Sequence, residues 1–356
     1  MRAKGMNMNA RMMAMAGLAA ILLAAGGGVA DITIETVPVG NIGNTGEWSG
    51  ESYGGYGPDR ICGAVDYEYN IGTYEVTAGQ YCEFLNAVAK SDPHGLYNSS
   101  MDSSSYGCQV TQHGTSGNYT YDFSGRPSGT EADWANRPVS FVSWGDAARF
   151  CNWLTNGQPT GPQDLTTTED GSYYLNDASS NVALLAVTRT SPEDGGRYYI
   201  PTEDEWYKVA YYDGDNGVYY DYPTGTDSVP SNDLVEPTDP GNNVTFYIGG
   251  GDYTIGSPHY RTEVGAHENS ESPYATFDQG GNVWEWNETI LHGTYRGVRG
   301  GSFSDGDGLH GAGRYAWPPD GENDSHGFRI SEVPEPATLA LLALGGLAVV
   351  RRKRNS

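Results

Sequence analysis

One glutamate of this sequence stands where a carboxylate needs a partner. Glu285 lies between two tryptophans in the segment 280–286, directly after a pair of glycines. Glycine pairs beside bulky aromatic residues are typical of places where the backbone passes close to a packed ring. A carboxylate in such an apolar setting must bind a cation or accept hydrogen bonds, because burying an unpaired charge is very unfavourable. The sequence predicts that Glu285 binds a metal ion or pairs with an arginine such as Arg299 or Arg329.

Two common metal motifs do not account for the rest of the chain. The seven histidines are scattered without HxxxH or HExxH spacing, which counts against a zinc protease. The segment 213–217 begins like the calcium loop of an EF-hand, but position 12 of that loop is Thr224, where an EF-hand has a bidentate glutamate.

Six segments resemble the signatures of a known family. They are 74–77 (YEVT), 137–144 (RPVSFVSW), 200–206 (IPTEDEW), 280–286 (GGNVWEW), 299–303 (RGGSF) and 327–329 (GFR). Together they are similar to the formylglycine-generating enzyme, or sulfatase-modifying factor, domain family over about residues 64–331. The resemblance implies a variant of the C-type-lectin fold. The expected fold class is α+β, a single loop-rich domain with a few amphipathic helices and short antiparallel strands.

The same resemblance implies structural calcium, a hard cation that prefers oxygen ligands. Its first site would take side-chain oxygens from Asp278 and Glu285 and carbonyl oxygens from Gly281 and Val283. A second, less complete site would take Asn243 and the carbonyl of Val244, with Asp252 as a further candidate. The alternative for Glu285 remains an ion pair with an arginine.

The oxidase chemistry of the family requires a pair of cysteines that hold copper, and oxygen ligands do not replace these soft ligands. The last cysteine of this chain is Cys151, and the positions that match the family pair are Gly306 and Gly311. We therefore expect no copper site and lean against an enzyme. What would remain is a groove lined by the polar residues Asp305, Asp307, His310, Arg314, Asp320 and Asp324. The alternative is that these are ordinary solvated loop residues.

Both ends of the chain resemble sorting signals. Residues 1–30 have a basic start, an apolar stretch and a small-residue cleavage site, as a secretory signal peptide does. Near the other end, Pro334-Glu335-Pro336 is followed by the apolar segment 337–350 and a basic tail. As a helix, 14 residues span about 21 Å, less than the roughly 30 Å of bilayer hydrocarbon. Segment 332–356 resembles the PEP-CTERM signal, which implies an exosortase as partner and sorting to the cell surface, with a plain membrane anchor as the alternative.

The net charge of the chain is consistent with an extracellular location. Residues 31–350 hold all 45 acidic residues and 13 of the 20 basic ones, a net charge of 13 − 45 = −32. Such a surface excludes nucleic acid and anionic lipid as partners and suits cations or neutral glycans. The four cysteines, Cys62, Cys82, Cys108 and Cys151, allow two disulfides in three connectivities. Cys82 and Cys151 lie on apolar helical stripes, where a buried thiol is the alternative to a disulfide.

The remaining pattern indicates one domain, residues 61–331, after an irregular lead-in over 31–60. Capping signals predict helices at 78–90, after Ser143 and after Thr202, and alternation predicts a strand at 64–71. Long loops rich in Gly, Ser, Asn, Tyr and Asp separate these elements, at 97–133, 155–199 and 213–262.

We predict an exported, surface-sorted binding or structural module of the cell envelope. Its ligand would be a glycan or another envelope component. The alternatives are a formylglycine-generating or related oxidase with a rearranged site, and a structural protein of the extracellular matrix.

Overall fold

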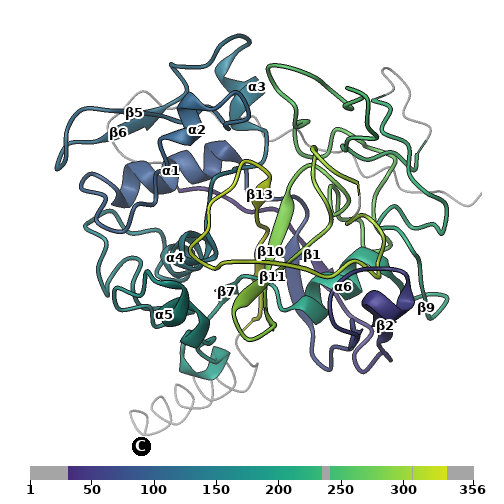
Figure 1. Ribbon diagram of the computed structural model, residues 1–356. Helices are drawn as coiled ribbons and strands as arrows, with labels where there is room; N and C mark the ends of the chain where they lie inside the picture. The colour runs from purple at the N-terminus through teal and green to yellow at the C-terminus, as the bar shows by residue number, and fades with distance from the viewer. Residues whose placement is uncertain (1–30, 235–240, 307, 335–356) are drawn as a thin grey trace, which may run out of the picture.

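The computed structural model describes residues 31–234, 241–306 and 308–334 (Figure 1). The predicted signal peptide 1–30, the segment 337–350 and Asp307 lie outside these residues. The helices are α1 (Ala78–Val88), α2 (Ser100–Ser103), α3 (Glu131–Ala135), α4 (Trp144–Thr155), α5 (Asn181–Ala186) and α6 (Glu203–Tyr211), with short 3-10 turns η1 (Glu51–Tyr53) and η2 (Pro192–Asp194).

Two four-stranded sheets form the centre of the molecule. The first has the order β1 (Thr36–Val39), β4 (Tyr69–Gly72), β14 (Ser331–Glu332) and β7 (Tyr198–Tyr199), with antiparallel neighbours throughout. The second has the order β12 (Tyr315–Trp317), β11 (Tyr295–Arg299), β10 (Trp284–Leu291) and β13 (His326–Gly327). Only its β10–β13 pair is parallel. Few helices and short, mostly antiparallel strands confirm the predicted α+β class.

Three small hairpins complete the strands: β2 (Glu47–Ser49) with β3 (Arg60–Cys62), β5 (Thr111–His113) with β6 (Thr120–Asp122), and β8 (Tyr212–Asp213) with β9 (Val218–Tyr219). The last one contains the segment that starts like a calcium loop. There the Asp213 carboxylate accepts hydrogen bonds from the backbone N–H groups of Asp215 and Asn216, which closes an ordinary turn.

The three helices predicted from their capping signals are confirmed. Thr77, Ser143 and Thr202 each accept a hydrogen bond from the backbone N–H three residues later, and the side chain at that later position accepts one from the backbone N–H of the cap. Such capping boxes satisfy N–H groups that the first turn of a helix leaves without partners. In Figure 1, α1, α4 and α5 lie on one side of β10 and β11, and α6 lies on the other.

Aromatic residues fill the core between these helices and the sheets. The phenyl rings of Phe150 in α4 and Phe328 lie 5.4 Å apart at nearly a right angle, which is a favourable edge-to-face arrangement. The largest side chains with almost no exposed surface are tryptophans: Trp134, Trp144, Trp153, Trp206 and Trp286. The signature segments therefore lie in the core.

The structure differs from the predicted secondary structure in three places. The lead-in 31–60 is not irregular, because β1 pairs with β4 and β2 pairs with β3. Pro38 can join β1 because this strand is at the sheet edge. The strand predicted at 64–71 begins only at Tyr69. The long loops also contain short elements, such as α2 and α5, that are too brief to produce a periodic pattern.

Candidate functional site

Glu285 on β10 lies at the centre of a buried ion pair. The guanidinium of Arg329 donates to both carboxylate oxygens, at 2.6 Å from Nε and 2.7 Å from the second nitrogen. The Trp206 indole nitrogen donates to the same carboxylate at 2.7 Å. All three side chains have no exposed surface. Of the two partners predicted for Glu285, the structure shows the arginine.

Glu203, the first residue of α6, binds three arginines. Arg299 and Arg314 donate to it from the interior at 2.7–2.9 Å, and Arg60 reaches it from the surface at 2.9 Å. Burial alone would raise the pKa of Glu203, but the charges of Arg299 and Arg314 outweigh burial and lower this pKa to about 2. The carboxylate is therefore ionised at any physiological pH.

Glu205, two residues further along α6, has a comparable set of partners. It accepts hydrogen bonds from Arg189 at 2.8 and 3.0 Å and from the Tyr67 hydroxyl at 2.6 Å. Arg189 also forms an ion pair with Glu288 on β10, at 2.9 Å. The first turn of α6 thus connects the helix to arginines from distant parts of the chain. We call this set of Glu203, Glu205 and Glu285 with their arginines the α6 charge network.

An excess of carboxylates surrounds the loop before β10. Glu75, Asp278 and Glu285 lie within electrostatic reach of one another, and Arg329 is the cation among them. Burial raises the pKa of Asp278 to about 6, although Gly265 N–H donates to it. One carboxylate oxygen of Glu75 is buried without a hydrogen-bond partner. Two buried acids beyond the one that Arg329 neutralises form a setting that favours a divalent cation.

The residues predicted for two separate calcium sites meet at one small cavity. Asn243 and Val244 from one site and Asp278 from the other line this cavity, together with His267, Ser270, Gln279 and Gly280 among others. Gly281 lies next to it: its backbone pairs with Thr245, and a Cβ atom there would lie 2.1 Å from the Thr245 carbonyl oxygen. Asp278, Asn243 and Val244 therefore fit a cation. Glu285 and Val283 do not line this cavity, and the Glu285 oxygens bind Arg329 and Trp206 instead.

Three of the polar residues predicted to line a groove, Arg314, Asp305 and His310, have separate partners in the structure. Arg314 is buried and binds Glu203. Asp305 accepts hydrogen bonds from Trp284 and Ser302, and His310 lies 3.6 Å from Asp221. Arg314 in particular belongs to the α6 charge network, where its charge compensates a buried acid.

The two glycines at the positions of the family cysteines are packed against aromatic side chains. A Cβ atom at Gly306 would lie 2.6 Å from a ring carbon of Phe246, which is itself buried. A Cβ atom at Gly311 would lie 3.1 Å from the Tyr207 hydroxyl oxygen. Side chains at both positions would need their neighbours to move.

All four cysteines are buried free thiols; of the two alternatives left open for Cys82 and Cys151, a disulfide or a buried thiol, the structure shows the thiol. Cys62 lies 3.4 Å from the Arg299 guanidinium, but burial raises the pKa of its thiol in spite of that charge. A thiol in this state is a poor nucleophile and a poor metal ligand.

A cluster of tyrosines was not singled out from the sequence. Tyr106, Tyr247, Tyr253 and Tyr260 come from two of the long loops, and each is half-buried. Their rings pack in a row with centroid distances of 4.6 Å (Tyr106–Tyr260), 5.2 Å (Tyr253–Tyr260) and 4.6 Å (Tyr247–Tyr253). Phe303 of the RGGSF segment lies beneath Tyr106 and Tyr260. The excess of tyrosine in the loops was the only signal for this tyrosine cluster.

The structure shows a loop-rich α+β domain whose signature residues are buried. Comparison with known families identifies the family to which this domain belongs. Residues 39–332 match the sulfatase-modifying factor enzyme 1-like domain, and residues 332–354 match the PEP-CTERM protein-sorting motif. The chain belongs to the sulfatase-modifying factor enzyme 1-like family. With the sorting motif, it is an exported, surface-sorted protein that an exosortase-type enzyme processes.

One solved structure shows the same fold, and two others are more distantly similar. Treponema denticola variable protein 1 aligns with a TM-score of 0.50 and 17% identity, covering 87% of this chain and 98% of that one. CarF (TM-score 0.46, 20% identity, 84% and 98% covered) and PvdO from Pseudomonas aeruginosa (0.46, 14%, 83% and 93%) are also similar. No curated protein matches the chain. Within the described residues, none of the helices has the length and apolar character needed to cross a bilayer.

Removing the charge of Glu203 tests the α6 charge network. We expect Glu203→Gln to lower the free energy of unfolding at neutral pH by about 3–5 kcal/mol, because Arg299 and Arg314 would be left buried without compensation. The folded pKa of Glu203 is depressed, so its contribution is complete above the unfolded value of 4.5 and is lost as the pH falls towards about 2. Urea unfolding of both proteins should therefore show a difference that narrows over this range.

The exposed Glu193 provides the matched control. Glu193→Gln should change the free energy of unfolding by less than about 0.5 kcal/mol. Equal urea midpoints for Glu203→Gln and the wild type at neutral pH would show that the network does not stabilise the fold.

Proposed function

We propose that this protein is a binding module of the cell envelope, whose C-type-lectin-like domain contacts a neutral glycan or another envelope component through the tyrosine cluster. The observation that carries the proposal is the row of half-buried rings in Tyr106, Tyr247, Tyr253 and Tyr260 over Phe303. Tyrosine offers a large, rigid face and a hydroxyl group, which suits contact with polar ligands.

The charge of the protein narrows the ligand class. The span 31–350 carries a net charge of 13 − 45 = −32, which repels nucleic acid and acidic polymers. A neutral polysaccharide is not repelled, and it presents hydroxyl groups and apolar ring faces to the tyrosines. The basic group at the cluster, Arg261, lies over the Phe303 ring at 5.1 Å and donates to backbone carbonyls. Arg261 therefore contacts the cluster through the Phe303 ring and the Tyr106 backbone.

We also propose that the domain is not a formylglycine-generating oxidase. Copper needs two thiolates there, and this chain has Gly306 and Gly311 at the matching positions. The Phe246 ring occupies the space that a side chain at 306 would need. The four thiols elsewhere are buried.

Attachment to the membrane is the remaining part of the proposal. The segment 337–350 would hold the precursor in the membrane until the exosortase-type enzyme acts, or permanently in a host without that enzyme. Its 14 residues are short for a stable anchor, at about 21 Å as a helix.

Binding assays on immobilised glycans and on polysaccharide from the producing cell's envelope test the tyrosine cluster. We expect saturable binding that Tyr253→Ala weakens by about tenfold or more, equivalent to about 1.4 kcal/mol. Tyr174→Ala should leave the affinity unchanged, because Tyr174 is an exposed tyrosine outside the cluster. Absence of glycan binding, or equal affinity of all three proteins, would reject the cluster as the binding surface and favour a purely structural role in the matrix.

A peptide assay tests the absence of oxidase activity. We expect a sulfatase-type peptide to retain its cysteine after incubation with the protein, oxygen and added Cu⁺, as measured by mass spectrometry. The double variant Gly306→Cys/Gly311→Cys should remain inactive and unfold at a lower temperature, because overpacking a core costs about 1–3 kcal/mol. Conversion of the peptide thiol to an aldehyde by the wild type would contradict this assignment.

Calcium is proposed as a structural cofactor at the cavity lined by Asn243, Val244 and Asp278. A cation that binds only the folded state stabilises it by mass action, about 2.7 kcal/mol at a hundred times Kd. We therefore expect a calcium chelator to lower the Tm of the wild type and re-added calcium to restore it. Asp278→Asn should reduce this response, and Asp213→Asn, in the β8–β9 turn, should preserve it. A wild-type Tm that is independent of calcium would exclude the cofactor.

A further inference from the structure

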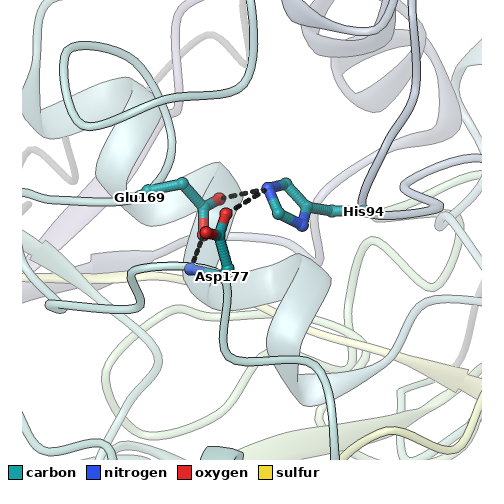
Figure 2. Close-up of side chains that lie close together, drawn as sticks. All are labelled: His94, Glu169 and Asp177. Carbon is teal, nitrogen blue, oxygen red and sulfur yellow. Dashed lines mark hydrogen bonds and ion pairs between the residues drawn. The ribbon is translucent and has the colours of Figure 1, made fainter.

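Three side chains that can bind a metal ion lie close together on two long loops, outside the family signature segments. His94 lies in the connection between α1 and α2, and Glu169 and Asp177 lie in the connection between α4 and α5. Figure 2 shows the His94 ring directed at both carboxylates. One ligand atom from each residue lies within 4.8 Å of the other two.

The distances from His94 Nε2 to the two carboxylates are longer than those of good hydrogen bonds. His94 Nε2 lies 3.6 Å from a Glu169 oxygen and 3.4 Å from an Asp177 oxygen, whereas a good N–H···O bond measures about 2.7–3.2 Å. The pair His113–Asp122, at 2.9 Å, shows a true bond between the same residue types in this protein. In a tetrahedral zinc site with bonds of about 2.0–2.2 Å, neighbouring ligand atoms are about 3.3–3.6 Å apart. The His94 distances match that spacing.

Outer groups orient Glu169, as they commonly orient ligands in metal sites. Arg149 donates to both of its oxygens at 2.7 and 3.0 Å, and the Thr168 hydroxyl donates at 3.0 Å. The Asp177 backbone N–H donates to Glu169 at 3.0 Å, which holds the two carboxylates side by side. Glu169 is buried, whereas the Asp177 side chain is 82% exposed, so an ion could enter from solvent and keep a water ligand there.

The local charge favours a cation. The carboxylates of Asp92, Glu169 and Asp177 act on His94 electrostatically, and the guanidinium of Arg149 opposes them. Burial and the charge of Arg149 lower the pKa of His94, which favours the neutral form of imidazole that coordinates metal ions.

We propose that His94, Glu169 and Asp177 bind a divalent transition-metal ion, with Zn²⁺ as the best fit. Imidazole with two carboxylates suits zinc better than calcium, which prefers an all-oxygen shell. The ion would cross-link the loop 89–99 to the loop 156–180 and leave a fourth position for water. This site shares no residue with the tyrosine cluster or with the calcium cavity, so its test is independent of the proposed function.

Titration calorimetry with Zn²⁺ alone as the probe tests the site, on the full chain without a polyhistidine tag and with calcium present throughout. We expect one zinc ion per chain in the wild type. Asp177→Asn should weaken binding by about tenfold or more, and since this side chain is exposed, the variant should keep the wild-type circular dichroism spectrum. Co²⁺ in place of Zn²⁺ should give the visible absorption of tetrahedral cobalt in the wild type and lose it in Asp177→Asn.

Two variants serve as controls for surface binding of zinc. His113→Ala removes another histidine that lies beside an aspartate and should leave zinc affinity unchanged. Asp278→Asn, designed for the calcium cavity, should also leave it unchanged. Zinc binding that is absent from the wild type, or equal in the wild type and Asp177→Asn, would overturn the proposal.

Discussion

The structure depends on the pairing of three buried glutamates, Glu203, Glu205 and Glu285, with arginines supplied from distant parts of the chain. Leaving one such charge without its partner costs several kcal/mol, so the arrangement is stable only when all partners meet. Arg299, Arg314 and Arg329 follow α6 by about a hundred residues, and each must reach α6 or β10. In a domain whose strands are mostly two to five residues long, these ion pairs fix the relative position of elements that share few backbone hydrogen bonds. We infer that the α6 charge network specifies the fold as much as it stabilises it.

This explains why the family signatures are readable in a chain that lacks the copper-binding cysteines. The signature residues Glu203, Glu285, Arg299 and Arg329 bind one another, and Trp206 donates to Glu285. Their role is to build the scaffold, and that role does not change when Gly306 and Gly311 occupy the cysteine positions. A match to the signatures therefore reports the scaffold, whereas activity depends on residues outside them. In this chain the loops of the scaffold carry the tyrosine cluster.

The sequence predicted what local chemistry determines. Capping boxes located α1, α4 and α6, and the apolar surroundings of Glu285 showed that it needed a partner. Sequence analysis did not identify partners that lie far apart in the chain. Arg314 was placed in a groove because its partner Glu203 is 111 residues away. Asn243 and Asp278 were assigned to two separate calcium sites, whereas in the structure both line one cavity. His94 was counted among scattered histidines, because its two acidic neighbours come from another loop.

The acidity of the chain also has a structural cause, which follows from how its long loops are held. All four cysteines are free, so disulfides do not tie these loops together. Carboxylates do so instead, because an ionised oxygen forms strong hydrogen bonds with backbone N–H groups. Asp92 accepts from Leu96 and Tyr97, Glu169 accepts from Asp177, and Asp213 accepts from Asp215 and Asn216. A domain that orders its loops in this way accumulates negative charge as it adds loops.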